Sequence, residues 1–126
     1  MTFARRWPHR RTSALGLALW LGLLLRPEGA GASQHAVFDR LTSGDIDLSR
    51  SVLQDVLETQ RSQQMRLWRS DATGVSGSVM PLRTFKIKTG HYCRDYRETV
   101  VANGLMDSRD GTACRSDGGL WVPIEN

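Results

Sequence analysis

The dipeptide Asn103-Gly104 lies between two long runs rich in residues that favour β-strands. It is typical of a two-residue type I′ turn, because both central positions of that turn need a positive φ. A loop of two residues makes Ala102 face Leu105 and fixes the register of the whole hairpin. In that register the residue numbers of every cross-strand pair sum to 207. The sequence therefore predicts a hairpin that extends from Tyr92 to Arg115.

The same register brings together side chains that attract each other. Besides Cys93 and Cys114, it matches two opposite-charge pairs, a hydroxyl pair and an apolar pair: Glu98–Arg109, Arg97–Asp110, Thr99–Ser108 and Val101–Met106. Each pair of this kind favours its register by ~0.2–1 kcal/mol. A shift of one residue would separate all of them, so we expect this register and no neighbouring one.

The hairpin predicts a structural disulfide between Cys93 and Cys114. Counted outward from Ala102 and Leu105, this pair is non-hydrogen-bonded, and the Cα atoms of such pairs come within ~4.5 Å. Disulfides span Cα distances of ~4.4–6.8 Å. Closing this loop stabilises the fold by about 3 kcal/mol in the chain-entropy model. A redox-active role is disfavoured, because the two cysteines do not form a Cys-x-x-Cys motif.

One residue leaves an alternative open inside the second strand. Gly111 follows Asp110 and is the kind of residue that marks a β-bulge, which would slip the pairing beyond it. In an uninterrupted ladder Gly111 instead lies opposite Tyr96, whose ring can cover a strand glycine.

Residues 1–32 are predicted to be a signal peptide. A basic segment (5–11) precedes an apolar run (14–25), and Ala30-Gly31-Ala32 supplies a small-x-small cleavage pattern before Ser33. Twelve apolar residues at ~1.5 Å each span about 18 Å, less than the ~30 Å of a hydrocarbon core. We expect general secretion, with twin-arginine export as the alternative, and no transmembrane helix after cleavage. No cysteine stands at the cleavage point for lipid attachment.

The positive charge of the chain belongs to this leader. The net charge is +4, from 17 Lys and Arg and 13 Asp and Glu; five of the basic residues and one acid precede Ser33. The remaining chain is therefore neutral, which argues against nucleic acid as a partner. Its length of roughly 94 residues allows one small domain.

The pattern of the exported part predicts an α+β fold: one N-terminal amphipathic helix packed on a small twisted antiparallel sheet of about four or five strands, with one disulfide. Residues 33–44 are predicted to be a flexible lead-in that breaks at Gly44, and residues 45–126 the domain. An apolar stripe predicts the helix over 47–63. Its members are Val52, Leu53, Val56 and Leu57. Extended segments are predicted over 65–69, 76–80, 82–88 and 120–122, with an edge or a bend at Pro81.

Few residues of the exported part suit catalysis. Its two histidines, His35 and His91, are not grouped with cysteines or acids at zinc-ligand spacing, and no glycine-rich phosphate loop occurs. We therefore expect no enzyme, no catalytic residue, no metal and no cofactor. A hydrolase that uses His91 is the alternative from that class.

A local excess of positive charge between residues 83 and 97 indicates a candidate anion-binding face. Its residues are Arg83, Lys86, Lys88 and Arg94. The competing interpretation, ordinary solvated strand positions, is favoured. Core packing is likewise favoured over an exposed ligand platform for the aromatic residues Trp68, Tyr92, Tyr96 and Trp121.

Several spaced motifs resemble the C-terminal domain of the seventeen-kilodalton bacterial surface-antigen family, over residues 45–123. They are Gly77-x-Val79-x-Pro81-x-Arg83-Thr84-Phe85, Gly90-x-Tyr92-Cys93-Arg94-x-Tyr96-x-x-Thr99-Val100, Gly111-Thr112-Ala113-Cys114-Arg115 and Asp117-Gly118-x-x-Trp121.

The resemblance implies a non-enzymatic protein of the Gram-negative cell envelope, in the periplasm, at the outer membrane or cell surface, or secreted. Members of the family often carry a lipoprotein cysteine and a glycine zipper, and this sequence shows neither. The expected partner is an envelope component, whether protein, lipid head group or polysaccharide. The alternative function is a small periplasmic or secreted ligand-binding module, or an inhibitor of a cell-wall hydrolase.

Overall fold

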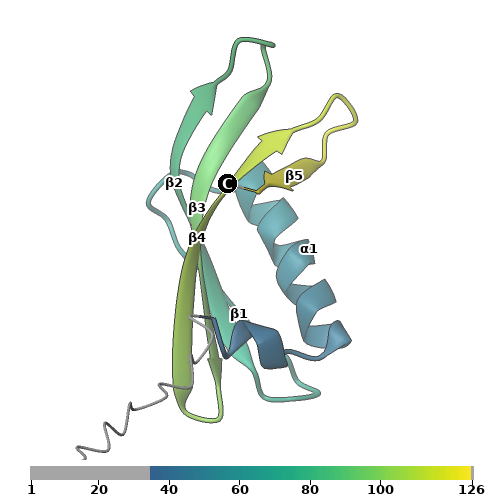
Figure 1. The fold of residues 1–126 in the computed structure, drawn as a ribbon, viewed down its shortest axis with the longest axis vertical. Coiled ribbons are helices and arrows are strands. Elements are labelled where there is room, and N and C mark those ends of the chain that lie inside the picture. The colour runs from purple at the N-terminus through teal and green to yellow at the C-terminus, as the bar shows by residue number, and fades with distance from the viewer. Residues whose placement is uncertain (1–34, 126) are drawn as a thin grey trace, which may run out of the picture. The chain divides into compact units, whose positions relative to one another are not determined.

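The structure is a computed structural model that describes residues 35–125, so the predicted signal peptide and its cleavage point lie outside the described residues. It confirms the predicted α+β class. One helix, α1, packs on one face of a five-stranded antiparallel sheet with strand order β1-β2-β3-β4-β5 (Figure 1). The elements are a 3₁₀ turn η1 (Phe38–Arg40), α1 (Ser43–Thr59), β1 (Arg66–Arg69), β2 (Ser76–Lys86), β3 (Tyr92–Ala102), β4 (Leu105–Arg115) and β5 (Trp121–Ile124).

The β3–β4 hairpin has the predicted register over its full length. Every pair from Cys93–Cys114 to Ala102–Leu105 sums to 207. Asn103 and Gly104 have φ values of 52° and 75°, as a type I′ turn requires. The predicted disulfide is present, with the Cα atoms of Cys93 and Cys114 4.0 Å apart.

Gly111 pairs with Tyr96 without a bulge. A Cβ atom at Gly111 would lie 2.7 Å from both Cζ and the hydroxyl oxygen of Tyr96. The tyrosine ring therefore covers the glycine, and any larger residue at position 111 would displace it.

Strand β2 is bent at its proline. Its register against β3 shifts between Pro81 and Arg83, and β1 accompanies β2 only as far as Val79. Pro81 thus lies both at a bend and at the point where β2 becomes an edge, which agrees with the missing N–H of proline.

Helix α1 begins and ends four residues before the predicted bounds, and Gly44 lies inside its first turn instead of breaking the chain. The cause is a capping box. The Thr42 hydroxyl accepts a hydrogen bond from the Asp45 backbone N–H (3.2 Å), and the Asp45 carboxylate accepts one from the Thr42 N–H (3.3 Å). Asp45 also accepts a hydrogen bond from the Thr73 hydroxyl (2.7 Å), which ties the start of α1 to the β1–β2 turn.

Part of the predicted lead-in is packed against the domain. Val37 and Phe38 are buried, and the guanidinium carbon of Arg109 lies 4.0 Å from the centroid of the Phe38 ring. The Val37 N–H donates to Asp107 of β4 (3.4 Å). The packed part of the chain therefore begins before the predicted boundary at residue 45, because η1 supplies apolar side chains to the core.

The core lies between α1 and the sheet in two clusters. The first joins the helix stripe to the middle of the sheet; its members are Leu53, Val56, Leu57, Val79, Tyr96, Ala113 and Trp121. The second lies beneath η1 and contains Val37, Phe38, Trp68, Val75 and Val100. Three of the predicted stripe residues are buried, and Val52 packs against both clusters.

Candidate functional site

The two faces of the sheet have different surroundings. Successive strand residues point to opposite faces, and the buried residues Trp68, Val79, Tyr96 and Val100 mark the face that packs on α1. We call this the helix face and the opposite side the open face. Within residues 35–125 no helix packs on the open face.

The residues of the predicted anion-binding face do not form one surface. Arg83 pairs in register with Asp95 on the open face, whereas Arg94 pairs with Thr84 on the helix face. Lys86 extends over the Tyr92 ring, with its ammonium 5.2 Å from the centroid, and Lys88 lies in the β2–β3 turn. Strand alternation separates residues that are neighbours in sequence.

Arg94 has a structural role at the end of α1. Its side chain is buried, and one guanidinium nitrogen donates to the Leu57 carbonyl oxygen (2.6 Å) while the other lies 3.4 Å from the Ser62 hydroxyl. Burial lowers the pKa of this guanidinium from its usual value. Arg94 thus satisfies a carbonyl group in the last turn of the helix.

On the open face, a ladder of polar side chains is paired within the sheet. Arg97 forms a bidentate contact with Asp110 (2.7 and 2.9 Å), and the hydroxyl oxygens of Thr99 and Ser108 are 2.8 Å apart. Asp95 accepts hydrogen bonds from Thr112 and Arg83, which lower the pKa of its carboxyl group. The polar side chains of this ladder therefore already have hydrogen-bond partners within the sheet.

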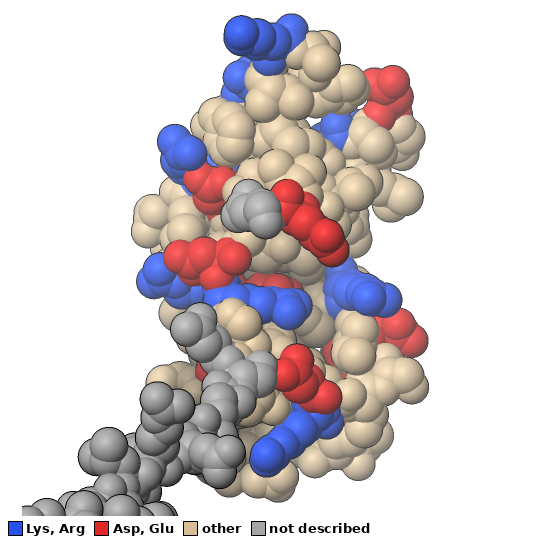
Figure 2. All heavy atoms as spheres, in the orientation of Figure 1, with Lys and Arg blue, Asp and Glu red and all other residues tan. Residues whose placement is uncertain are grey.

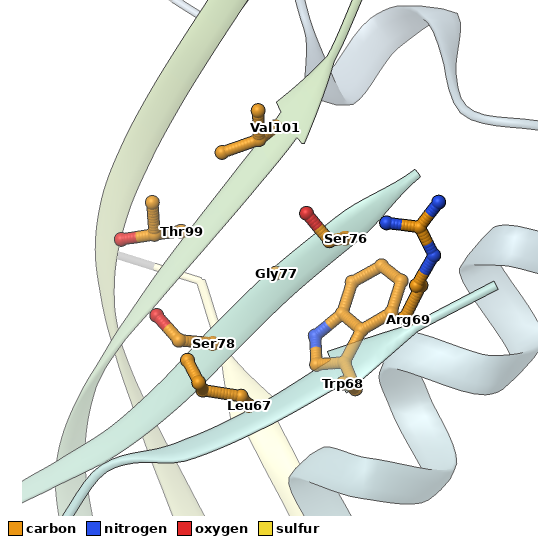
Figure 3. Close-up of a pocket in the computed structure, with 8 residues that line it drawn as sticks. All are labelled: Leu67, Trp68, Arg69, Ser76, Gly77, Ser78, Thr99 and Val101. Carbon is orange, nitrogen blue, oxygen red and sulfur yellow. The ribbon is translucent and has the colours of Figure 1, made fainter. Parts of the chain in front are cut away.

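Beside this ladder the open face contains a groove of about 550 Å³ at the β1 end (Figure 3). Its lining residues come from three adjacent strands: Leu67, Trp68, Arg69, Ser76, Gly77, Ser78, Thr99 and Val101. A Cβ atom at Gly77 would lie 2.6 Å from two ring carbons of Trp68 and 2.5 Å from the Thr99 carbonyl oxygen. The lack of a side chain at Gly77 therefore lets the Trp68 ring pack against β2 on the helix face, on the opposite side of the strand from the groove.

Two large apolar side chains are exposed at or beside the groove. Leu67, a lining residue, is 75% exposed, and Met106, the register partner of the lining residue Val101, is 72% exposed. Clustered exposed apolar side chains are typical of interaction sites. The sequence reasoning did not identify this patch, although strand alternation around Trp68 would have placed Leu67 on the face opposite the core.

A second cavity, of about 440 Å³, lies between α1, η1 and the helix face. The buried residue Glu98 is among its lining residues; its carboxylate accepts a hydrogen bond from Arg109 (2.9 Å) and lies 3.4 Å from the Ser49 hydroxyl. Both oxygens of this acid have partners, and they connect α1 to β3 and β4.

His91 joins two turns at the far end of the sheet. Its Nε2 lies 2.9 Å from Asp117 in the β4–β5 turn, and its Nδ1 lies 2.9 Å from the Thr89 hydroxyl. The order of atoms is that of a hydroxyl–imidazole–carboxylate triad, but the Asp117 side chain is 97% exposed. Solvent surrounds the carboxylate, whereas a triad needs a buried one to orient the imidazole.

The described residues contain no group of three or more histidine, cysteine or acidic side chains that could hold a metal ion. No helix between residues 35 and 125 is long and apolar enough to cross a membrane. Figure 2 shows acidic and basic side chains interspersed over the visible surface, with basic ones alone at the tip of the β2–β3 hairpin. On the visible surface, positive charge therefore gathers at the tip of the β2–β3 hairpin and does not form an extended basic face.

Comparisons with known proteins agree with the resemblance noted in the sequence. Residues 55–122 match the profile of the family described as 17 kDa outer membrane surface antigen. The 17 kDa surface antigens of Rickettsia bellii and Rickettsia felis are each 38% identical to the chain over 80 residues, which are 64% of this chain and 50% of theirs. That of Rickettsia prowazekii is 35% identical over 71 residues, which cover 56% of this chain and 45% of the relative.

The chain spans about half the length of these curated relatives. No solved structure matches it. The profile match covers the last turn of α1 and the sheet as far as Trp121 and Val122, and therefore includes the disulfide, the ladder and the groove. The chain belongs to the 17 kDa outer membrane surface antigen family.

Proposed function

We propose that this protein is an exported, non-enzymatic component of the cell envelope that binds another envelope component through the open face of its sheet. The observation that carries the proposal is the groove on that face, with the exposed side chains of Leu67 and Met106 beside it. A stable monomer gains nothing from such a patch, and partners cover such patches when they bind.

The polar ladder supports the same role. Arg97 and Asp110 satisfy each other, as do Thr99 and Ser108, so a partner can cover them without leaving buried polar groups unpaired. The disulfide between β3 and β4 holds the strands that form the ladder in a fixed register. A preformed surface of this kind binds with a smaller loss of conformational entropy.

The family name supports a place at the bacterial surface. We infer export by the predicted signal peptide, followed by residence in the periplasm or at the outer membrane. In this proposal the hydrogen bonds of His91 with Thr89 and Asp117 hold two turns together and have no catalytic role.

Site-specific photo-cross-linking in the envelope tests the proposal. A photoreactive amino acid replaces Leu67 on the open face or, as the matched control, Ser51 on the exposed side of α1. After irradiation and fractionation, we expect a discrete cross-linked species from position 67 and none from position 51.

Two results would count against the proposal. Equal cross-linking from both positions would show that the open face has no special role. Recovery of the protein in the cytoplasm with an intact N-terminus, measured by Edman sequencing of the fractionated material, would contradict export to the cell envelope.

A further inference from the structure

We propose that the groove on the open face binds an anionic amphiphile, with the apolar chain in the groove and the charged head at Arg69. This inference rests on the proposed function, because it names the chemistry that the open face recognises.

The charge of Arg69 is available, unlike that of the other arginines in the sheet. Five strand arginines pair with an acid, and Arg94 donates to a carbonyl group. The five ion pairs are Arg66–Asp55, Arg83–Asp95, Arg97–Asp110, Arg109–Glu98 and Arg115–Glu58. Arg69 is exposed and forms no ion pair with any residue between 35 and 125.

Arg69 lies at one end of the groove, beside Ser76 (Figure 3). Its guanidinium group, an N–H donor without an acceptor, suits a carboxylate or a phosphate oxygen. A neutral apolar ligand would leave this charge unused, whereas a small inorganic anion would leave the apolar groove empty.

The rest of the groove suits an alkyl chain. The side chains of Leu67 and Val101 are apolar walls, and the small residues Ser76, Gly77 and Ser78 leave the floor free of bulky groups. The volume of about 550 Å³ lies within the ~300–1,000 Å³ of ordinary ligand sites. Met106, the exposed register partner of Val101, has a flexible side chain beside the groove that adapts to chains of different shape.

A fluorescence displacement assay on the purified full chain tests the proposal. The probe is a dansyl-labelled undecanoic acid, used below its micellar concentration, and its emission rises on transfer to an apolar site. Dodecanoate, dodecyl phosphate and neutral dodecanol compete for the site. We expect both anions to displace the probe at about fivefold lower concentration than the alcohol, as a partly exposed ion pair implies; their ratio distinguishes a carboxylate from a phosphate head.

Variants at two positions, Arg69 and Ser78, separate the charge from the groove. Arg69→Gln should weaken the affinity for dodecanoate about fivefold and leave the affinity for dodecanol unchanged. Arg69→Lys should retain most of the affinity for dodecanoate. The control Arg61→Gln, at an exposed arginine that does not line the groove, should change neither affinity. Ser78→Leu fills the groove and should prevent binding of all three ligands. Its control, Ser51→Leu, adds the same side chain on the exposed side of α1.

The outcomes are distinct. Equal affinity for dodecanoate and dodecanol, or no effect of Arg69→Gln, would overturn the assignment of Arg69. Binding that survives Ser78→Leu would overturn the assignment of the groove. If the probe does not bind but a protein is cross-linked at position 67, the amphiphile is not the ligand, and the open face remains a protein-binding surface. If the probe does not bind and no cross-link forms at position 67, the proposed function is wrong as well.

Discussion

The helix face and the open face are built from the same strands but treat their polar residues differently. On the helix face Arg94 and Glu98 are buried, and each is held by partners on α1, the Leu57 carbonyl and the Ser49 hydroxyl. On the open face Arg97 and Asp110 pair with each other at the surface. Polar residues on the first face connect layers of the fold, whereas those on the second only connect neighbouring strands.

The apolar residues show the same contrast. Val79 and Leu57 are almost completely buried between the sheet and α1, whereas Leu67 is among the most exposed large apolar side chains of the described residues. Side-chain packing on the helix face therefore supplies most of the folding free energy. Apart from loss of the disulfide between Cys93 and Cys114, changes on the open face should affect binding far more than stability.

The largest difference is expected between two leucine truncations. Leu57→Ala removes a buried side chain from the core and should lower the free energy of unfolding by about 3–4 kcal/mol. Leu67→Ala should lower it by less than about 0.5 kcal/mol, as exposed substitutions do. Urea unfolding followed by circular dichroism measures both. Equal losses would show that the open face is part of the core.

Loss of the disulfide should have the next largest effect. The double variant Cys93→Ser and Cys114→Ser frees a loop of 21 residues and should reduce stability by about 3 kcal/mol. For a domain of this size the melting temperature should fall by about 12 °C or more. Calorimetry with and without reducing agent checks this, and an unchanged melting temperature would exclude a stabilising role for the bond.

Two isosteric changes compare the ion pairs of the two faces. Glu98→Gln affects a buried acid and should cost about 1–2 kcal/mol, because Arg109 and Ser49 lose a charged acceptor. Asp110→Asn affects an exposed pair and should cost about 0.5 kcal/mol or less. If the unfolding free energies of the two variants agree, burial does not distinguish the pairs.

The smallest expected effect is the change in the free energy of unfolding at acidic pH. Hydrogen bonds from Thr73 lower the pKa of Asp45, and those from Thr112 and Arg97 lower the pKa values of Asp95 and Asp110. A lowered pKa in the folded state stabilises the fold above the unfolded value of ~3.9, and this stabilisation is lost as pH falls through the folded value. Stability should therefore fall below about pH 4. Asp45→Asn should reduce this dependence more than Asp110→Asn, because Asp45 is buried.

The sequence predicted the features that depend on neighbouring strands. The Asn103-Gly104 turn fixes the β3–β4 register, and with it the disulfide and the cover of Gly111 by Tyr96. These features follow from one local geometry and from counting residues along two strands.

Features that depend on distant segments were not predicted. The start of α1 needs Thr73, 28 residues beyond Asp45, to complete the environment of its capping carboxylate. The roles of Arg94 and Arg69 depend on which face α1 covers and on which acids approach them. The count of basic residues between positions 83 and 97 therefore grouped Arg83 and Arg94, whose side chains lie on opposite faces of the sheet. The groove appears only when β1, β2 and β3 are aligned.

The variant Leu67→Glu tests the division between the two faces most directly. Its melting temperature and its recovery in the envelope cross-link are measured on the same preparation, with the photoreactive residue moved to position 106 on the same face. We predict an unchanged melting temperature and loss of the cross-linked species. A large fall in melting temperature, or a cross-link as strong as that of the unchanged protein, would contradict the separation of folding and binding between the two faces.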